Sequence, residues 1–195
     1  MSSTGRWLRA RRSSLDELTV SHGVDFFPGH KPIAVDPINR TIRFESGDVT
    51  HYDLLVYIPP HAPPAFVVEA GLAPAGGWVK VDPRTLATPG ERIWAVGDVT
   101  AIPLANGKFL PKAGVFAKGQ ADAAARNIAA VVRGTPPVEF KGDGACFVEM
   151  GDRKAGFASA NFYATPDPVV RLKTPGRRWY WAKVFVERTW FPRWL

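Results

Sequence analysis

The chain has 195 residues, and its 46% hydrophobic share is enough for a packed core and too high for a disordered chain. No apolar run approaches the roughly 20 residues that a membrane-spanning helix needs. The 25 lysines and arginines exceed the 18 acidic residues, giving a net charge of +7 that is concentrated at the two ends. This end-loading indicates contact of the termini with an anionic surface, either lipid headgroups or nucleic acid.

The single cysteine, Cys146, excludes a disulfide framework within the chain and favours a reducing compartment. The N-terminal residues are rich in arginine and serine and carry no acid before Asp16. This composition faintly resembles a transit peptide, but the segment has no apolar core and therefore is not a secretory signal.

The first part of the sequence alternates strand-sized runs with turn residues. A short helix is predicted at 14–22. Strands are predicted at 24–27, 33–36, 41–44 and 54–58. The last of these is entirely apolar, as expected for a strand buried on both faces of a parallel sheet, and the prolines that follow must end it.

The middle of the chain combines short strands with one long helix. A helical turn or two is predicted at 66–71, and strands at 78–82 and 93–96 are expected to be neighbours. The helix is predicted to begin at Pro111 and to end at Gly134, because proline suits the first helical position and glycine the position just past the end.

The faces of this helix can be assigned from spacing. Lys118, Asp122 and Arg126 recur every four residues and are expected to form a solvated stripe. Gln120 and Asn127 lie seven residues apart and are expected on the less exposed side. Most of the remaining helix is apolar, so it should be buried on most sides.

The composition changes after residue 134. Strands are predicted at 146–150 and 155–163, and the prolines between 166 and 175 indicate an irregular connection. A terminal helix is predicted at 178–191, broken by Pro192. Four of the seven tryptophans fall in 179–195, among arginines and lysines, which is typical of a helix lying on a membrane surface; the alternative is an aromatic face packed on the core.

Gly97 and Asp98 follow a predicted strand and precede the long helix by one loop. A glycine lets the backbone approach a ligand, a carboxylate accepts hydrogen bonds from sugar hydroxyls, and a helix N-terminus offers free N–H groups. The order strand, Gly-Asp, loop and helix therefore outlines a nucleotide site. By itself a Gly-Asp turn is common, so an ordinary turn is the alternative.

The sequence PGERIWAVGDVT at 89–100, followed by LPKAGVFAKGQADAAARNIAA at 110–130, resembles the second flavin motif of flavoproteins with two dinucleotide domains, in particular sulfide:quinone oxidoreductases. The resemblance implies FAD as cofactor. It implies that Asp98 binds the ribityl chain and that Gly97 permits the approach. Residues at the helix start would lie over the pyrimidine edge of the flavin: Lys112, Ala113 and Gly114. For Lys112 the alternative is an ordinary exposed lysine.

The resemblance covers about residues 15–195 and implies an α/β fold that is incomplete. Residues 1–72 would be the C-terminal part of the second, NAD-like domain, 73–134 the C-terminal part of the FAD-binding domain, and 135–195 an α+β element for membrane and quinone contact. The sequence contains no strand–GxGxxG–helix unit, so the first fingerprint of this Rossmann-like fold is missing. The chain is therefore expected to be the C-terminal half of a longer protein. Either Met1 is not the native start, or the missing half is another chain or was lost.

The sequence GDGACFVEMGD at 142–152 resembles the catalytic-cysteine segment of the same family and implies a redox role for Cys146. In that family the cysteine works with a second one, which this chain lacks. A lone cysteine is otherwise a small buried hydrophobe. Phe147 and Lys183 are the residues that the resemblance assigns to a quinone site. The downstream aromatic residue of the family is replaced by Val186.

The resemblance predicts a FAD-dependent oxidoreductase that passes electrons from a sulfur donor to a quinone, located at the cytoplasmic face of a membrane as a peripheral protein. Its partners would be quinone, an anionic membrane surface and the missing half or another subunit, with no nucleic acid. One alternative is a type II NADH:quinone dehydrogenase or another FAD/NAD(P)-dependent reductase. Another is a non-catalytic remnant or a basic module that binds membrane surfaces. The four histidines have no ligand spacing, so no metal site is predicted.

Overall fold

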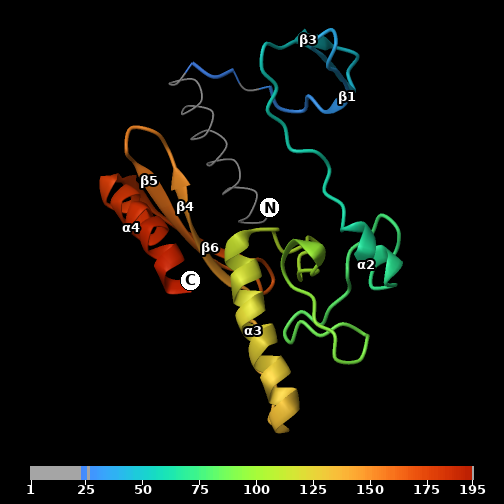
Figure 1. Cartoon of the computed structure of the whole chain (residues 1–195). Helices are drawn as coiled ribbons and strands as arrows, with labels where there is room; N and C mark the ends of the chain where they lie inside the picture. Colours follow the sequence, from blue (N-terminus) through green and yellow to red (C-terminus); the bar gives the residue numbers. More distant parts are fainter. Residues whose placement is uncertain (1–22, 26, 195) are drawn as a thin grey trace. The chain divides into compact units, whose positions relative to one another are not determined.

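The computed structural model describes residues 23–25 and 27–194. The chain divides into two compact units, one up to Pro60 and one from His61 onward, which are described separately (Figure 1). The helix predicted at 14–22 lies outside the described residues.

The first unit contains a small antiparallel sheet with the strand order β1-β2-β3. Its strands are β1 (Pro32–Asp36), β2 (Thr41–Phe44) and β3 (Val49–His51). Asp36 shapes the turn after β1, because its Oδ1 accepts hydrogen bonds from the backbone N–H groups of Ile38 and Asn39 at 2.9 and 3.0 Å. Strands β1 and β2 confirm the predictions at 33–36 and 41–44. Strand β3 was missed because three residues are too few to show an alternating pattern.

Residues 54–58, predicted as a buried strand, are instead irregular and exposed. Leu54, Val56 and Ile58 are 82, 86 and 83% exposed. The prediction was wrong because a strand of a parallel sheet needs neighbouring strands and covering helices, and none of the described strands pairs with this segment. The described residues of 24–27 likewise form no strand.

The second unit contains four helical elements. They are α2 (Ala65–Glu69), the 3-10 turn η1 (Gly97–Val99), α3 (Gly114–Arg133) and α4 (Arg177–Trp194). Helix α2 confirms the helical turns predicted at 66–71. Helix α3 ends where predicted, at Gly134, whose φ of 67° is the left-handed conformation that glycine adopts most easily.

Helix α3 begins later than predicted. Ala113 is extended, and its carbonyl accepts the first helical hydrogen bonds from Phe116 and Ala117. Pro111 therefore lies outside the helix, and its prediction as the first helical residue was wrong. The sequence could not reveal this, because contacts of Lys112 with a distant loop, described below, hold the intervening segment.

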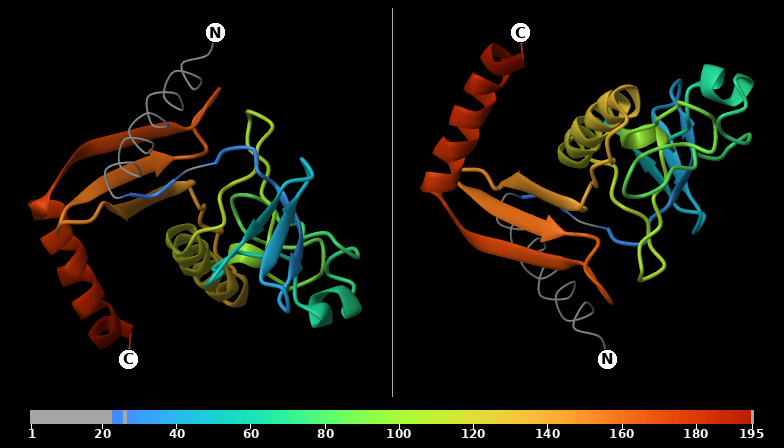
Figure 2. Two further views of the ribbon diagram at one scale, coloured as in Figure 1. Left: turned by 90° about the horizontal axis from the view of Figure 1, so that it is seen from above. Right: turned by 90° about the horizontal axis from the view of Figure 1, so that it is seen from below.

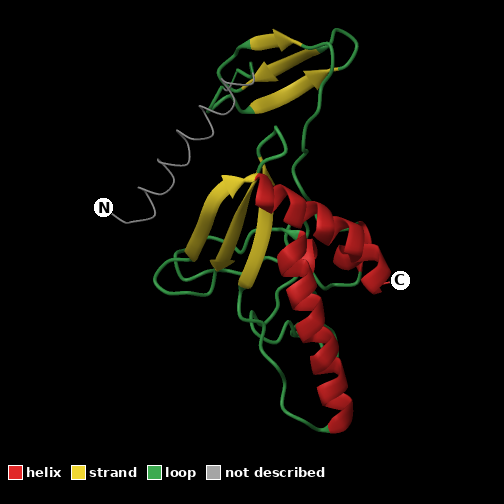
Figure 3. Ribbon diagram, turned by 90° about the vertical axis from the view of Figure 1, so that its left-hand side faces the viewer, coloured by secondary structure: helices red, strands yellow, loops and turns green. Residues whose placement is uncertain are grey.

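The C-terminal part of the second unit contains another antiparallel sheet, with the strand order β4-β5-β6 (Figure 3). Its strands are β4 (Asp143–Glu149), β5 (Ala155–Asn161) and β6 (Val169–Gly176). Strands β4 and β5 agree with the predictions at 146–150 and 155–163. The irregular connection predicted between 166 and 175 is wrong: most of it is β6, an edge strand, where Pro175 is tolerated because one side of the strand needs no hydrogen-bond donors.

Helix α4 follows β6 without a loop (Figure 2). It continues to Trp194, so the predicted break at Pro192 is wrong. A proline this close to a helix end forfeits only one backbone hydrogen bond, which does not end the helix by itself.

The segments predicted as neighbouring strands at 78–82 and 93–96 form only isolated bridges. Val79 pairs with Thr100 in parallel, and Trp94 pairs with Ala87 in antiparallel orientation. The prediction was wrong because Asp82 turns the chain: its carboxylate accepts hydrogen bonds from the backbone N–H groups of Arg84 and Thr85. The intervening loop, rather than the other strand, takes the available hydrogen bonds.

The core of the second unit forms around α3. Leu86 and Ile102 are 0 and 2% exposed and pack with Phe116 of α3. Gln120 and Asn127 are both 2% exposed, which confirms their predicted face. The amide of Asn127 donates to two backbone carbonyls and accepts from one backbone N–H, so this buried polar group is satisfied on every side.

The sheet β4-β5-β6 lies between α3 and α4. Successive strand residues point to opposite faces. A Cβ added to Gly144 would lie 2.9 Å from Cζ of Phe116, so this face meets α3. On the other face, Phe147 contacts Phe157, and Phe157 stacks on Trp179 of α4.

The close contact at Gly144 predicts a large effect of a small substitution. Gly144→Ala should destabilise the chain by about 1–3 kcal/mol, because Phe116 is buried and cannot yield to the new methyl group. Gly156→Ala is the matched control on the same face, since a Cβ there meets only ordinary contacts at 3.6 Å and beyond. Urea unfolding followed by circular dichroism measures both. Equal stability of the two variants would contradict the packing of α3 on this sheet.

Candidate functional site

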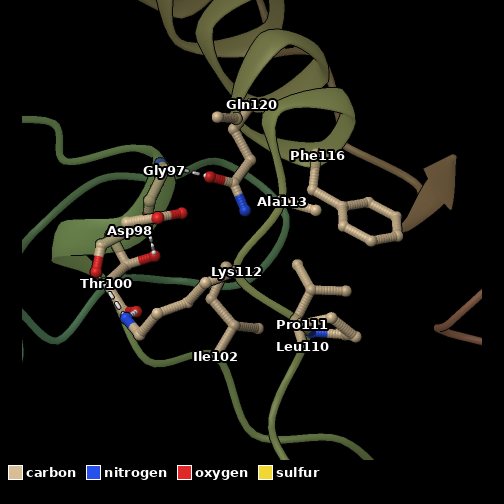
Figure 4. A pocket seen from close by; sticks show the side chains of 11 residues that line it. Gly97, Asp98, Thr100, Ile102, Leu110, Pro111, Lys112, Ala113, Phe116 and Gln120 are labelled. Atoms are coloured by element: carbon tan, nitrogen blue, oxygen red, sulfur yellow. Dashed lines mark hydrogen bonds between the residues drawn. The ribbon is translucent and has the colours of Figure 1, made fainter. Parts of the chain in front are cut away.

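The Gly97–Asp98 corner lies directly against α3 (Figure 4). Gly97 has a φ of +72°, and a Cβ at this position would lie 3.2 Å from Cβ of Ala117. Its N–H donates a hydrogen bond of 2.5 Å to Oε1 of the buried Gln120. Glycine is required here for both its left-handed backbone and the close approach of the helix.

Lys112 connects the same corner to the segment before α3. Its Nζ donates hydrogen bonds to the backbone carbonyls of Asp98 and Thr100, the latter at 2.7 Å. The ammonium also lies 3.4 Å from the centre of the Trp78 ring, a cation–π contact. Burial lowers the pKa of Lys112, and the charge of Asp98 partly offsets this effect. The side chain is thus directed at backbone carbonyls.

Asp98 is exposed, and its carboxylate makes no hydrogen bond or ion pair with the described residues. Beside it, α3 begins with no side chain capping its first N–H groups. Gly97, Asp98 and Ala113 line one cleft, whereas Gly114 is not part of its lining. Binding of a cofactor by these residues stays a prediction.

The cleft between the corner and α3 is small. It contains about 220 Å³ of empty space, with about 10 Å³ in which the centre of a water molecule can lie. It is lined by the corner and by the start of α3 (Figure 4). Pockets that bury a drug-sized ligand usually enclose about 300 to 1,000 Å³. This chain therefore provides one wall for part of a large ligand.

Cys146 and Phe147 lie on opposite faces of β4. Cys146 shares the face of Gly144, which meets α3, and two residues of strand separate them by about 7 Å. The thiol is exposed, so the alternative of a buried hydrophobe does not apply. Phe116 both lines the cleft and contacts Gly144, which places the thiol on the same side of the sheet as the cleft.

An aromatic layer occupies the α4 face of the sheet. The ring centres of Phe147 and Phe157 are 5.3 Å apart, and those of Phe157 and Trp179 are 4.9 Å apart at an angle of 15°. The indole N–H of Trp179 is buried and has no hydrogen-bond acceptor among the described residues. A buried donor without a partner costs free energy, which an acceptor from a ligand would recover.

Lys183 lies one helical turn after Trp179 and is held between two carboxylates. Its Nζ is 2.8 Å from Glu187 and 3.2 Å from Glu149 of β4. The hydrogen bond to Glu187, followed by that to Glu149, raises the pKa of Lys183. The ammonium is therefore fixed at the edge of the aromatic layer.

The same face carries an open hollow of about 510 Å³ beyond this layer. Its lining is mainly apolar and includes Ala145, Ser159 and Arg171. Ala145 is two residues from Phe147 on the same face of β4, so hollow and aromatic layer are continuous along the sheet.

Among the described residues, no three histidine, cysteine or acidic side chains gather closely enough to hold a metal ion. None of the described helices is long and apolar enough to cross a membrane.

The fold of this chain matches solved structures of larger proteins. One is the sulfide:quinone oxidoreductase of the hyperthermophilic bacterium Aquifex aeolicus, with a TM-score of 0.75 and 24% identity, over 92% of this chain and 44% of that one. Another is a chain in the mitochondrial ATP synthase tetramer of Tetrahymena thermophila, with a TM-score of 0.58 and 19% identity, over 76% and 36% of the two chains. No family model and no curated protein matches the sequence.

The chain thus has the mixed helix and sheet fold of part of a sulfide:quinone oxidoreductase, and it spans less than half the length of either neighbour. This confirms the predicted resemblance at the level of the fold. The Rossmann-like arrangement of the complete domains stays a prediction.

The sequence did not indicate that two residues, Gln120 and Trp179, belong to the site. Gln120 was placed on the correct face, but nothing indicated its bond to Gly97. Trp179 was recognised only as one of several aromatic residues in the terminal helix. The one usable signal was a polar residue on the predicted buried side of a helix, which needs a hydrogen-bond partner, and this signal applied to Gln120 alone.

The exposure of Cys146 makes a direct prediction. The folded chain should react with one equivalent of Ellman's reagent without denaturant, because its only cysteine is accessible. Cys146→Ser should not react. A wild-type thiol that reacts only after denaturation would contradict the exposed position of Cys146 on β4.

Proposed function

We propose that this chain is part of a FAD-dependent oxidoreductase that passes electrons from a sulfur donor through FAD to a quinone. The observation that carries the proposal is the Gly97–Asp98 corner, which shares a cleft with the uncapped start of α3. The fold likeness to a sulfide:quinone oxidoreductase supports it. A remote fold likeness does not fix the substrate, so function is argued from the site.

The residues of the cleft fit one stretch of a flavin. The free carboxylate of Asp98 can accept hydrogen bonds from ribityl hydroxyls, and Gly97 leaves room for a close approach. The N–H groups at Ala113 and Gly114, with the helix dipole, can stabilise negative charge on the ring. Bound FAD would supply the capacity to accept electrons from the donor and release them to the quinone. The rest of the flavin needs walls from outside the described residues.

Cys146 is the residue that would meet a sulfur donor. It is exposed and lies on the sheet face that also contacts Phe116 of the cleft. A thiolate can attack a sulfur atom that carries a leaving group, but a disulfide or polysulfide bridge within the protein needs a second cysteine, which these 195 residues do not contain. The second thiol must come from another polypeptide segment. Without it, NAD(P)H is the alternative donor, as in a type II NADH:quinone dehydrogenase.

The quinone would bind on the other face of the sheet. Phe147 offers a ring for stacking, Trp179 an unused N–H for a quinone carbonyl, and Lys183 a fixed positive charge nearby. The hollow of about 510 Å³ continues from this layer. Quinones are membrane-bound, so we place α4 on an anionic membrane surface at the cytoplasmic face. Trp181 and Phe185 of α4 are 57 and 63% exposed, as expected for side chains that enter a lipid interface.

Two exposed apolar surfaces support a polypeptide partner. One is the segment 54–58, and the other is a stripe on α3. The stripe consists of exposed residues at helical spacing: Ala121, Ala125, Ile128 and Val132. A contiguous apolar surface of this kind marks an interaction site. We propose that the remainder of the flavoprotein fold, supplied by a further segment or another subunit, covers these surfaces, with domain limits near 1–72, 73–134 and 135–195.

A non-catalytic role is the second candidate. One solved chain with a similar fold belongs to a mitochondrial ATP synthase assembly. The small cleft and the single cysteine are equally consistent with a basic module that binds a membrane surface through α4.

The flavin proposal predicts FAD uptake that depends on Asp98. Titration of the full chain with FAD, followed by flavin fluorescence, should show binding, and Asp98→Ala should weaken it about tenfold because a charge-assisted hydrogen bond is lost. Asp122→Ala is the control, since this carboxylate of α3 pairs with Lys118 outside the cleft. A chain that takes up no FAD but floats with anionic liposomes would favour the non-catalytic module.

The quinone proposal predicts a specific role for Trp179. Trp179→Phe keeps the aromatic ring but removes the N–H donor, so the affinity for a short-chain ubiquinone should fall about three- to tenfold. Trp181→Phe, at an exposed position of the same helix, should change the affinity less. Isothermal titration in anionic vesicles measures both variants. Equal affinities would remove Trp179 from the quinone site.

A further inference from the structure

The Gly97–Asp98 corner is held from two sides by side chains of this chain. Gln120 accepts the Gly97 N–H from the α3 side, and Lys112 donates to the carbonyls of Asp98 and Thr100 from the other side. No hydrogen bond of this set ends on the carboxylate of Asp98. The backbone of the corner is thus fixed while its carboxylate stays exposed.

Gln120 is a costly residue to place where it is. Its side chain is 2% exposed within a core of leucine, isoleucine, phenylalanine and alanine. A buried amide is tolerated only when it is hydrogen-bonded. The 2.5 Å bond to Gly97 supplies a partner, and it also caps an N–H that a residue with positive φ directs toward the helix.

The ammonium of Lys112 is likewise bound by groups of the protein. Two of its three N–H donors point at the carbonyls of Asp98, within η1, and of Thr100, directly after it. The ring of Trp78 lies 3.4 Å from the ammonium. Carbonyls at the end of a helical turn carry partial negative charge. The lysine therefore acts on the backbone of the corner, and its ammonium is not presented to the cleft as a free cation.

We propose that Lys112 and Gln120 are positioning residues: they hold the Gly97–Asp98 corner in its binding conformation before a ligand arrives, and Lys112 acts through the backbone instead of pairing with the ligand. The proposal rests on the proposed function for the identity of the ligand, FAD. A site that is already ordered loses less entropy on binding, so its affinity depends on residues that do not touch the ligand.

The test combines measurements with and without FAD on the full chain. Gln120→Met keeps the length of the side chain and removes the acceptor, and Lys112→Met removes the ammonium. Without FAD, Gln120→Met should raise the hydrogen-exchange rate of the Gly97 amide about tenfold or more, and Lys112→Met should raise that of the corner amides, including Thr100. Each variant should weaken FAD binding about tenfold. Lys112→Arg should restore part of the affinity. Lys108→Met, an exposed lysine outside the cleft, is the control.

The flavin reduction potential separates positioning from direct pairing. Lys112→Met should leave the potential of bound FAD unchanged, because the ammonium faces the backbone. A lower potential with unchanged amide exchange would overturn the proposal and make Lys112 a direct partner of the flavin. Unchanged exchange in both variants would also overturn it. If Gln120→Met does not fold, Lys112→Met decides whether the corner is held before FAD binds, because Lys112 is only half-buried and its replacement should be tolerated. A wild-type chain that binds no FAD refutes the proposed function, while the exchange rates still decide the positioning roles.

Discussion

The hydrogen bond from the Gly97 N–H to Gln120 joins two segments that are 23 residues apart and fixes the site to the core. It requires a glycine, because a Cβ at this position would press on Ala117. The hydrogen bond also depends on a fixed position of α3. Asn127 fixes the helix through hydrogen bonds to two other backbone segments. Phe116, which packs against Gly144, extends the same rigid body to the sheet. Corner, helix and sheet therefore form one scaffold, and the cleft lies where they meet.

The two lysines assigned to the site are both engaged by groups of the protein itself. Lys112 is bound by carbonyls and by the ring of Trp78, and Lys183 by Glu149 and Glu187. Both are partly buried, which favours such pairing because an isolated buried charge is costly. The charged side chains that line the cleft are Asp98 and Lys112, and the start of α3 adds the positive end of its dipole.

Local signals in the sequence predicted what depends on local physics. The left-handed glycine at 134, the buried faces of Gln120 and Asn127, and strands β1, β2 and β4 follow from turn chemistry and periodicity. Features that depend on distant partners failed: the apolar segment 54–58 has no sheet to join among the described residues, and the helix start shifted because Lys112 is held by another loop. The site could be located from Gly97 and Asp98, but the direction of the Lys112 side chain and the unpartnered N–H of Trp179 follow only from the three-dimensional arrangement.

The pleat of β4 has a chemical consequence for the proposed reaction. Quinone rings are electrophiles, and a thiolate that reached one would add to it and form a dead-end covalent product. Cys146 and Phe147 are adjacent in sequence, yet they project from opposite sides of the strand. In the proposed enzyme, the backbone of β4 would therefore separate the thiol from a quinone bound on the Phe147 side and prevent their addition reaction.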